Sequence, residues 1–126
     1  MPISDLLNEL EVPLINDATC RDAVNRSEQL NLRKMSPDLI VCAGYLDGSK
    51  DSCFGDSGGP LVCFDEIDGV WKQTGIVSYG RGCAVKDFPG FYSKVSAYKG
   101  WIMTQIACKF YYTSLINFFY KYRLID

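Results

Sequence analysis

The segment that spans residues 50–60 is the part of the chain best suited to chemistry. Ser57 lies between small residues in a glycine-rich loop, so its hydroxyl is sterically open. Glycines on both sides allow backbone N–H groups to point at a bound oxyanion without interference from a Cβ atom. The adjacent Asp56 can hold such a turn in place. The segment therefore predicts a serine nucleophile, whereas the plainer interpretation is a small residue in a tight turn.

Histidine is the residue type that the chain lacks. The 126 residues include none, so the chain itself cannot supply an imidazole general base or a histidine metal ligand. A serine hydroxyl is a weak nucleophile without an adjacent base. Catalysis at Ser57 would therefore need a base from a second chain.

Composition and charge narrow the class of protein. The 13 Lys and Arg residues and the 15 Asp and Glu residues give a formal net charge of −2. This charge is too close to neutral to indicate a nucleic-acid or membrane-surface partner. The hydrophobic fraction of 48% is typical of a globular protein, and the length suits one domain.

The cysteines are widely spaced along the chain. None lies in a Cys-x-x-Cys pair, which argues against a zinc site or a thioredoxin-type redox site. Such spacing predicts a disulfide framework, which forms in an oxidising compartment. Residues 1–5 have neither the basic nor the apolar segment of a signal peptide, so we expect no export signal in this chain. The cysteines are Cys20, Cys42, Cys53, Cys63, Cys83 and Cys108.

Two elements are expected before the first buried strand. Apolar residues alternate with Glu and Pro over residues 10–14, which predicts a half-buried strand. Asp17 is expected to cap a short helix that runs to about Val24. The polar residues 25–37 are expected to be irregular.

Short strands and long glycine-rich loops are expected in the rest of the chain. Strands are predicted over residues 39–43, 60–64, 70–79 and 90–95, with loops over 44–59 and 80–89 and a turn over 65–69. Tyr98, Ile102 and Ile106 recur every four residues, which predicts a terminal helix. The pattern indicates an all-β barrel or sandwich.

A resemblance to a known family covers most of the chain. The motif over residues 55–60, Gly-Asp-Ser-Gly-Gly-Pro, resembles the nucleophile signature of the trypsin/chymotrypsin serine endopeptidases, and the resemblance extends over residues 2 to about 107. It implies the second six-stranded antiparallel β-barrel of the trypsin-like fold, incomplete and followed by a C-terminal helix. Residues 1–107 would form this partial protease domain. Residues 108–126, which hold seven of the seventeen aromatic residues, would be an extension, either a partner-binding tail or a sticky segment without a role.

The resemblance also implies roles for individual residues. Ser57 would be the acylating nucleophile, the N–H groups of Gly55 and Ser57 would form the oxyanion hole, and Asp56 would pair with a freed N-terminus. Asp51 would lie at the base of a pocket that binds substrate Arg or Lys through charge-assisted hydrogen bonds. The other residues of the substrate site would be Ser52, Ser78, Tyr79, Gly80, Gly82 and Gly90. Tyr79 stands where the family more usually has Trp, which keeps an aromatic wall.

The cysteines take part in the same resemblance. It implies the disulfides Cys20–Cys42 and Cys53–Cys83. Cys63 would pair with an upstream cysteine that this chain lacks, which leaves Cys63 and Cys108 either free or paired with each other.

The match departs from the family because it begins in mid-domain. The first barrel, which carries the histidine and aspartate of the triad, has no counterpart here. We therefore expect a fragment that is inactive alone and needs the missing N-terminal barrel as its partner. The full-length protein would be secreted, would act on peptides or proteins with Arg or Lys, and would need no cofactor, metal, nucleic acid or membrane. Three interpretations stay open: half of a trypsin-like endopeptidase, a non-catalytic protease-homologue binding module, or a gene-model fragment without independent function.

Overall fold

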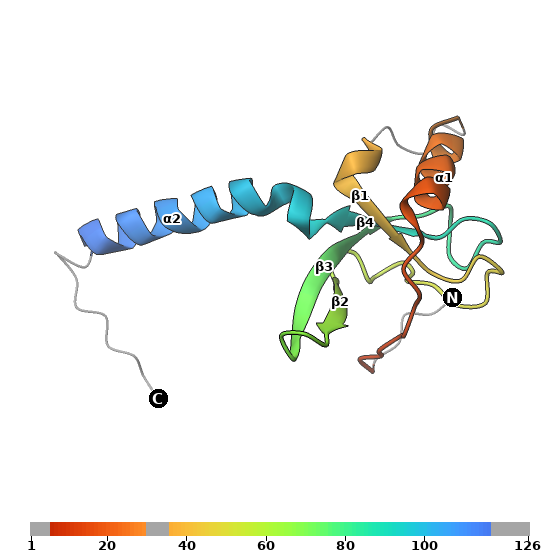
Figure 1. Cartoon of the computed structure of the whole chain (residues 1–126), viewed down its shortest axis with the longest axis horizontal. Helices are drawn as coiled ribbons and strands as arrows, with labels where there is room; N and C mark the ends of the chain where they lie inside the picture. The colour runs from red at the N-terminus through yellow and green to blue at the C-terminus, as the bar shows by residue number, and fades with distance from the viewer. Residues whose placement is uncertain (1–5, 30–35, 117–126) are drawn as a thin grey trace. The chain divides into compact units, whose positions relative to one another are not determined.

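The computed structural model describes residues 6–29 and 36–116, and the side chains among them as far as residue 107. The chain divides into two compact units, Met1–Ser96 and Ala97–Asp126. The first unit contains helix α1 (Asp17–Gln29) and a four-stranded antiparallel sheet (Figure 1). The second unit contains helix α2 (Lys99–Ile116), and the predicted terminal helix is confirmed.

The sheet has the strand order β1-β4-β3-β2 and is not closed. Its strands are β1 (Ile40–Ala43), β2 (Pro60–Asp65), β3 (Val70–Tyr79) and β4 (Gly90–Lys94). Each neighbouring pair is antiparallel, and a register shift interrupts β2 opposite β3 between Leu61 and Val62. An open antiparallel sheet followed by a helix near the end of the chain agrees with the predicted incomplete barrel.

Apolar side chains of β1 and β4 alternate between the two faces of the sheet. On one face, Ile40, Cys42 and Phe91 form a core with Ala23 and Val24 of α1. The helix therefore packs against the β1–β4 side of the sheet (Figure 1), and the Cys20–Cys42 disulfide links the two elements.

The second core lies on the opposite face of the sheet. It contains Ala43, Leu61 and Tyr92. Gly75 of β3 lies among these residues, since a Cβ atom there would come within 2.9 Å of Tyr92 Cβ and 3.2 Å of Leu61 Cδ2. The close approach of these side chains requires glycine at this position.

Strand β2 lies at one edge of the sheet, and apolar side chains near this edge are exposed. Phe64 of β2 and Trp71 of β3 are 51% and 68% exposed and meet edge to face, with their ring centroids 5.4 Å apart. Val62 is also exposed on β2. An open, apolar strand edge is what an unclosed barrel leaves behind.

The first helix corrects two predictions. Its N-terminal cap is Asn16, not Asp17, because Asn16 Oδ1 accepts a hydrogen bond from the Thr19 N–H at 3.0 Å. The helix also runs to Gln29 and includes residues 25–29, which were expected to be irregular. An ion pair between Asp22 and Arg26, four residues apart, stabilises this polar last part.

The strand predicted over residues 10–14 is wrong. Leu14 forms an isolated bridge to Ala43, and Ile15 N–H donates to Cys42 O at 2.9 Å. Pro13 cannot donate a backbone hydrogen bond, so it cannot extend the ladder with its own N–H. Leu39, predicted at the start of the next strand, lies instead in the 3₁₀ turn Pro37–Leu39.

The 3₁₀ turn Val95–Tyr98 precedes helix α2, so Tyr98 lies before the regular helix that its spacing predicted. Residues 117–126 of the predicted extension, and the side chain of Cys108, lie outside the described part. Within the described residues, no helix combines the length and apolar character needed to cross a membrane.

Candidate active-site loop and specificity site

Two loops that are distant in sequence are joined at one end of the sheet. The Cys53–Cys83 disulfide connects the loop over residues 44–59 with the loop over 80–89 (yellow and green-cyan in Figure 1). Asp87 N–H also donates to Leu46 O at 2.8 Å. The pairing of cysteines is the one that the family resemblance implied. The disulfide positions the predicted nucleophile loop against the predicted pocket loop.

The second loop turns sharply where it meets the first. Ala84 and Asp87 have φ angles of 54° and 65°, a left-handed conformation that residues other than glycine rarely adopt. Gly48 approaches so closely that a Cβ atom there would come within 2.7 Å of Ala84 O. These strained positions fix the direction of the Ala84 N–H, which points at Asp51.

Asp51 has one satisfied carboxylate oxygen and one buried oxygen without a partner in the described chain. Oδ2 accepts a hydrogen bond from the Ala84 N–H at 3.0 Å, whereas Oδ1 accepts none. Burial raises the pKa of Asp51 above its ordinary value of 3.8, although the backbone N–H groups of Ala84 and Ser52 act in the opposite direction. A buried, unpaired carboxylate oxygen is costly unless a ligand completes its hydrogen bonding.

Gly90 and Tyr92 of β4 form the surroundings of this oxygen. A Cβ atom at Gly90 would lie 2.9 Å from Asp51 Oδ1 and 3.2 Å from the Tyr92 hydroxyl. The Tyr92 hydroxyl is itself 3.2 Å from Ser52 Oγ, and burial raises the pKa of Tyr92. The structure thus brings together three predicted residues, Asp51, Ser52 and Gly90, with the hydroxyl of Tyr92.

Tyr92 is a member of this site that was not among the predicted site residues, because core packing was expected to be its main role. Its ring belongs to the core, where it is 4% exposed, so its apolar role conceals its polar end. A signal existed in the spacing, because residues 90 and 92 of one strand point to the same face.

The loop around Ser57 is held by hydrogen bonds of its own. Asp56 Oδ2 accepts a hydrogen bond from Cys53 N–H at 2.7 Å, and Asp56 O accepts one from Gly59 N–H at 2.9 Å. Gly58 N–H donates to Val77 O at 3.0 Å, which ties the loop to β3. The Ser57 side chain is exposed and forms no hydrogen bond within the described residues.

The remaining predicted residues lie where β3 ends and the second loop begins. Tyr79 stacks on Phe91 with a centroid distance of 4.7 Å, so its ring packs against the core shared with α1. Ser78 and Gly80 flank it, and Gly82 has a φ angle of 75°. Gly82 comes near Val85 rather than the Asp51 carboxylate.

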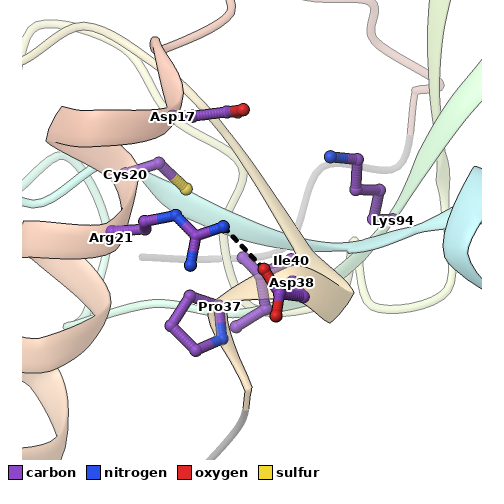
Figure 2. Close-up of a pocket in the computed structure, with 7 residues that line it drawn as sticks. All are labelled: Asp17, Cys20, Arg21, Pro37, Asp38, Ile40 and Lys94. Carbon is purple, nitrogen blue, oxygen red and sulfur yellow. Dashed lines mark hydrogen bonds and ion pairs between the residues drawn. The ribbon is translucent and has the colours of Figure 1, made fainter.

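A small pocket lies apart from these loops, between α1 and the strands β1 and β4 (Figure 2). Arg21 and Asp38 form an ion pair of 2.6 Å across it, and the other charged residues that line it are Asp17 and Lys94. Two acids and two bases balance each other, so the pocket has no clear preference for a charged ligand. No group of three or more metal-ligating side chains occurs within the part of the chain that the structure describes.

The geometry defines a class of protein: a disulfide-linked antiparallel β structure whose glycine-rich serine loop adjoins a half-buried carboxylate. The family model described as Trypsin matches residues 3–102. The chain belongs to the trypsin family of serine proteases.

Known relatives match about four fifths of the chain. It is 46% identical to transmembrane protease serine 5 of Homo sapiens over 99 residues, which is 79% of this chain and 20% of that protein. It is 42% identical to trypsin of Xenopus laevis over 103 residues, 82% of this chain and 37% of that protein. It is 43% identical to trypsin II-P29 of Gallus gallus, of which it covers 36%. The chain therefore spans between a fifth and two fifths of the length of these relatives.

Proposed function

We propose that this chain carries the nucleophile and the specificity site of a trypsin-like serine endopeptidase that cleaves after Arg or Lys. The observation that carries the proposal is the Asp51 carboxylate, whose buried Oδ1 lacks a partner in the described chain and lies beside Gly90. A guanidinium or ammonium group would donate to this oxygen and neutralise its charge. The absence of a side chain at Gly90 leaves room for the approach.

The proposed chemistry is acyl transfer at Ser57. Its Oγ would attack the scissile carbonyl while the histidine of a partner barrel takes the hydroxyl proton and passes it to the amine portion of the substrate, which leaves as the acyl-enzyme forms. Water would then hydrolyse the acyl-enzyme and release the peptide acid. The N–H groups of Gly55 and Ser57 would stabilise the oxyanion. The φ angle of 105° at Gly55 supports this role, because such a backbone conformation favours glycine.

Asp56 would shape the site rather than transfer protons. Its carboxylate accepts the hydrogen bond of Cys53 N–H, which fastens the turn immediately before Ser57. In the proposed complete enzyme the same carboxylate would exchange this partner for a freed N-terminus. Ser78, Tyr79, Gly80 and Gly82 would line the path of the substrate backbone.

The isolated chain is proposed to be inactive as a hydrolase. It contains no histidine, and Ser57 Oγ has no hydrogen-bonded base among the described residues. Loss of a triad member lowers the rate by several orders of magnitude. A barrel that supplies histidine and aspartate would be the partner that restores activity, and the disulfides favour an extracellular location for the complete protein.

A second candidate function is binding without turnover. Two observations favour it. The Asp51 site is formed, with an Oδ1 atom that has no partner in the described chain, and the sequence has no histidine to act as a general base. In that case the chain would be a protease homologue that captures Arg- or Lys-containing peptides.

The test uses residues 1–126 produced in an oxidising compartment, with Ser57→Ala as the matched control. A fluorophosphonate probe measures reactivity at Ser57, an arginine ester measures turnover, and binding of an arginine peptide measures the Asp51 site. We expect peptide binding without labelling or turnover. Labelling and turnover that disappear in Ser57→Ala would refute the proposed inactivity. A folded chain that does not distinguish arginine from glutamine peptides would refute the proposed specificity site.

A further inference from the structure

Two arginine side chains from different elements converge on one buried ring. Phe88, 8% exposed, lies in the loop over residues 80–89, two residues before Gly90. The guanidinium carbon of Arg26, from α1, is 4.8 Å from its ring centroid, and that of Arg81 is 4.7 Å away. Both distances are within the range of a cation–π interaction. Two positive charges therefore stack on a ring of the same loop whose Ala84 N–H contacts Asp51.

The two arginines differ in how far their charge is already satisfied. Arg26 Nε pairs with Asp22 Oδ2 at 2.9 Å, and its terminal nitrogen donates to Asp87 O at 3.0 Å. Arg81 is exposed, and its guanidinium forms neither an ion pair nor a hydrogen bond within the described residues. Arg26 thus anchors the loop, whereas Arg81 keeps its N–H groups available.

Stacking on Phe88 prepares Arg81 for an anionic ligand. The interaction uses the face of the guanidinium plane and leaves its N–H edge free for a carboxylate. It also restricts the rotamers of a long side chain, which lowers the entropy lost when a ligand binds.

Arg81 also has a defined position relative to the proposed substrate path. It directly follows Gly80, at the end of the segment 78–80 proposed to line the substrate backbone. Arg81 also lies in the same loop as Ala84, whose N–H donates a hydrogen bond to Asp51 Oδ2. In acyl transfer the acyl portion, N-terminal to the scissile bond, stays on the enzyme while the amine portion leaves. In the proposed function Asp51 binds the Arg or Lys that ends this acyl portion, and we take the adjoining segment 78–80 to pair with the substrate residues that precede that Arg or Lys.

We propose that Arg81, held on Phe88 beside Arg26, binds an Asp or Glu side chain located N-terminal to the substrate Arg or Lys. This inference rests on the proposed function of Asp51 and specifies its substrate class further. The preferred ligand is a peptide with an acidic residue followed, a few positions later, by Arg or Lys.

The experiment measures peptide affinity for the oxidised chain by fluorescence polarisation. Labelled peptides end in an arginine amide and carry Glu, or the neutral isostere Gln, at the second, third or fourth position before it. We expect the best Glu peptide to bind about three- to tenfold more tightly than its Gln counterpart at low salt. The preference should shrink as NaCl rises, because salt screens an exposed charge pair.

Three variants test whether Arg81 is responsible. Arg81→Gln should abolish the preference for Glu, and Arg81→Lys should retain part of it because the charge stays while the planar fork is lost. Lys86→Gln removes an exposed positive charge from the same loop and should leave the preference unchanged. If Arg81→Gln does not fold, Arg81→Lys decides the question: a Glu preference that Arg81→Lys leaves as large as in the unchanged chain would overturn the role of the Arg81 guanidinium.

The outcomes separate this inference from the function on which it rests. If peptides with Arg and with Gln at the last position bind equally, or if none binds, the Asp51 proposal fails and this inference fails with it. If arginine is required but Glu and Gln peptides bind alike, only the role of Arg81 is overturned. The same holds if the Glu preference survives Arg81→Gln in a folded chain.

Discussion

Asp51→Asn should stabilise the folded chain at neutral pH while it weakens ligand binding. The carboxylate is half-buried, and its Oδ1 has no hydrogen-bond partner in the described chain. Because burial raises the pKa of Asp51 in the folded state above 3.8, the folded chain binds more protons than the unfolded chain between the two pKa values. The free energy of unfolding then falls as the pH rises through this window. The cost of burying the ionised carboxylate is absent below the pKa of the unfolded chain and complete above the pKa of the folded chain.

The size of the effect follows from the single unsatisfied oxygen. A buried polar group without a partner costs about 1–3 kcal/mol. Since Asp51 is only half-buried and Oδ2 is satisfied by Ala84, solvent screening favours the lower end, about 1 kcal/mol. Asparagine keeps an acceptor for the Ala84 N–H and removes the charge. Urea unfolding of the oxidised chain should therefore show Asp51→Asn as the more stable protein near pH 7, with the difference vanishing near pH 3.

Asp47→Asn provides a control in the same loop, because the pKa of Asp47 is shifted in the direction opposite to that of Asp51. Hydrogen bonds from Ser49 lower the pKa of Asp47, which is exposed. The stability that they contribute is present above the unfolded pKa and is lost as the pH falls through the folded pKa. Asp47→Asn should therefore be neutral or slightly destabilising at pH 7. An Asp51→Asn protein that is less stable than the unchanged chain at pH 7, or equally shifted at both pH values, would refute the reasoning.

The same substitution should weaken the binding of an arginine peptide. Loss of a charge-assisted hydrogen bond of about 1.5–3 kcal/mol corresponds to a loss of roughly tenfold to a hundredfold in affinity. In the unchanged chain, affinity should fall as the pH is lowered through the raised pKa of Asp51, because protonation removes the charge. Calorimetric titrations at several pH values measure both effects.

Further substitutions test how the sheet, the loops and the helix are held. Gly75→Ala should destabilise the fold by about 1–3 kcal/mol in urea unfolding, because its Cβ would overlap the second core, whereas Gly100→Ala meets nothing within 4 Å and should be neutral or stabilising. Replacing Cys53 and Cys83 by Ser should cost about 3–4 kcal/mol and lower arginine-peptide affinity, since the disulfide closes a 30-residue separation; unchanged affinity would contradict its positioning role. Asn16→Ala should lower the thermal midpoint through loss of about 1 kcal/mol of helix capping.

The elements that the sequence predicted best are bounded by strong local signals. The strands β2, β3 and β4 lie between glycine, proline and aspartate turns, and the predicted and observed ends differ by at most one residue. Glycine-rich composition likewise predicted the loops on either side. These signals are local in the chain, so they can be interpreted without knowledge of the tertiary neighbours.

The errors arise where a distant residue decides the outcome. The alternating pattern over residues 10–14 suits a strand, but a strand needs a neighbour along its whole length, and Leu14 alone bridges to Ala43. Two acceptors were available at the helix start, and the geometry of the Thr19 N–H selects Asn16 over Asp17. Hydrophobic periodicity does not indicate whether residues 10–14 have a neighbouring strand to pair with, nor which residue caps the helix.

The candidate site shows the same division. The motif around Ser57 and the position of Asp51 could be identified from sequence by resemblance, because they follow a recognisable order of residue types. The convergence of Arg26 and Arg81 on Phe88 could not be, since 55 residues separate the two arginines and neither belongs to a motif. Such pairs become visible only when the disulfide and the sheet bring their elements together.

The proposed recognition of Arg or Lys and the proposed hydrolysis at Ser57 depend on different groups. The groups around the Asp51 carboxylate, namely Ala84, Gly90, Ser52 and Tyr92, come from loops and a strand of one compact unit joined by a disulfide. Activation of Ser57 instead requires a base, and the chain has no histidine to offer. Ligand affinity should therefore depend on the integrity of this unit alone, whereas turnover should depend on a partner. Adding a barrel that carries histidine and aspartate should raise the rate far more than the affinity, and a parallel rise in both would mean that the Asp51 site is itself incomplete without the partner.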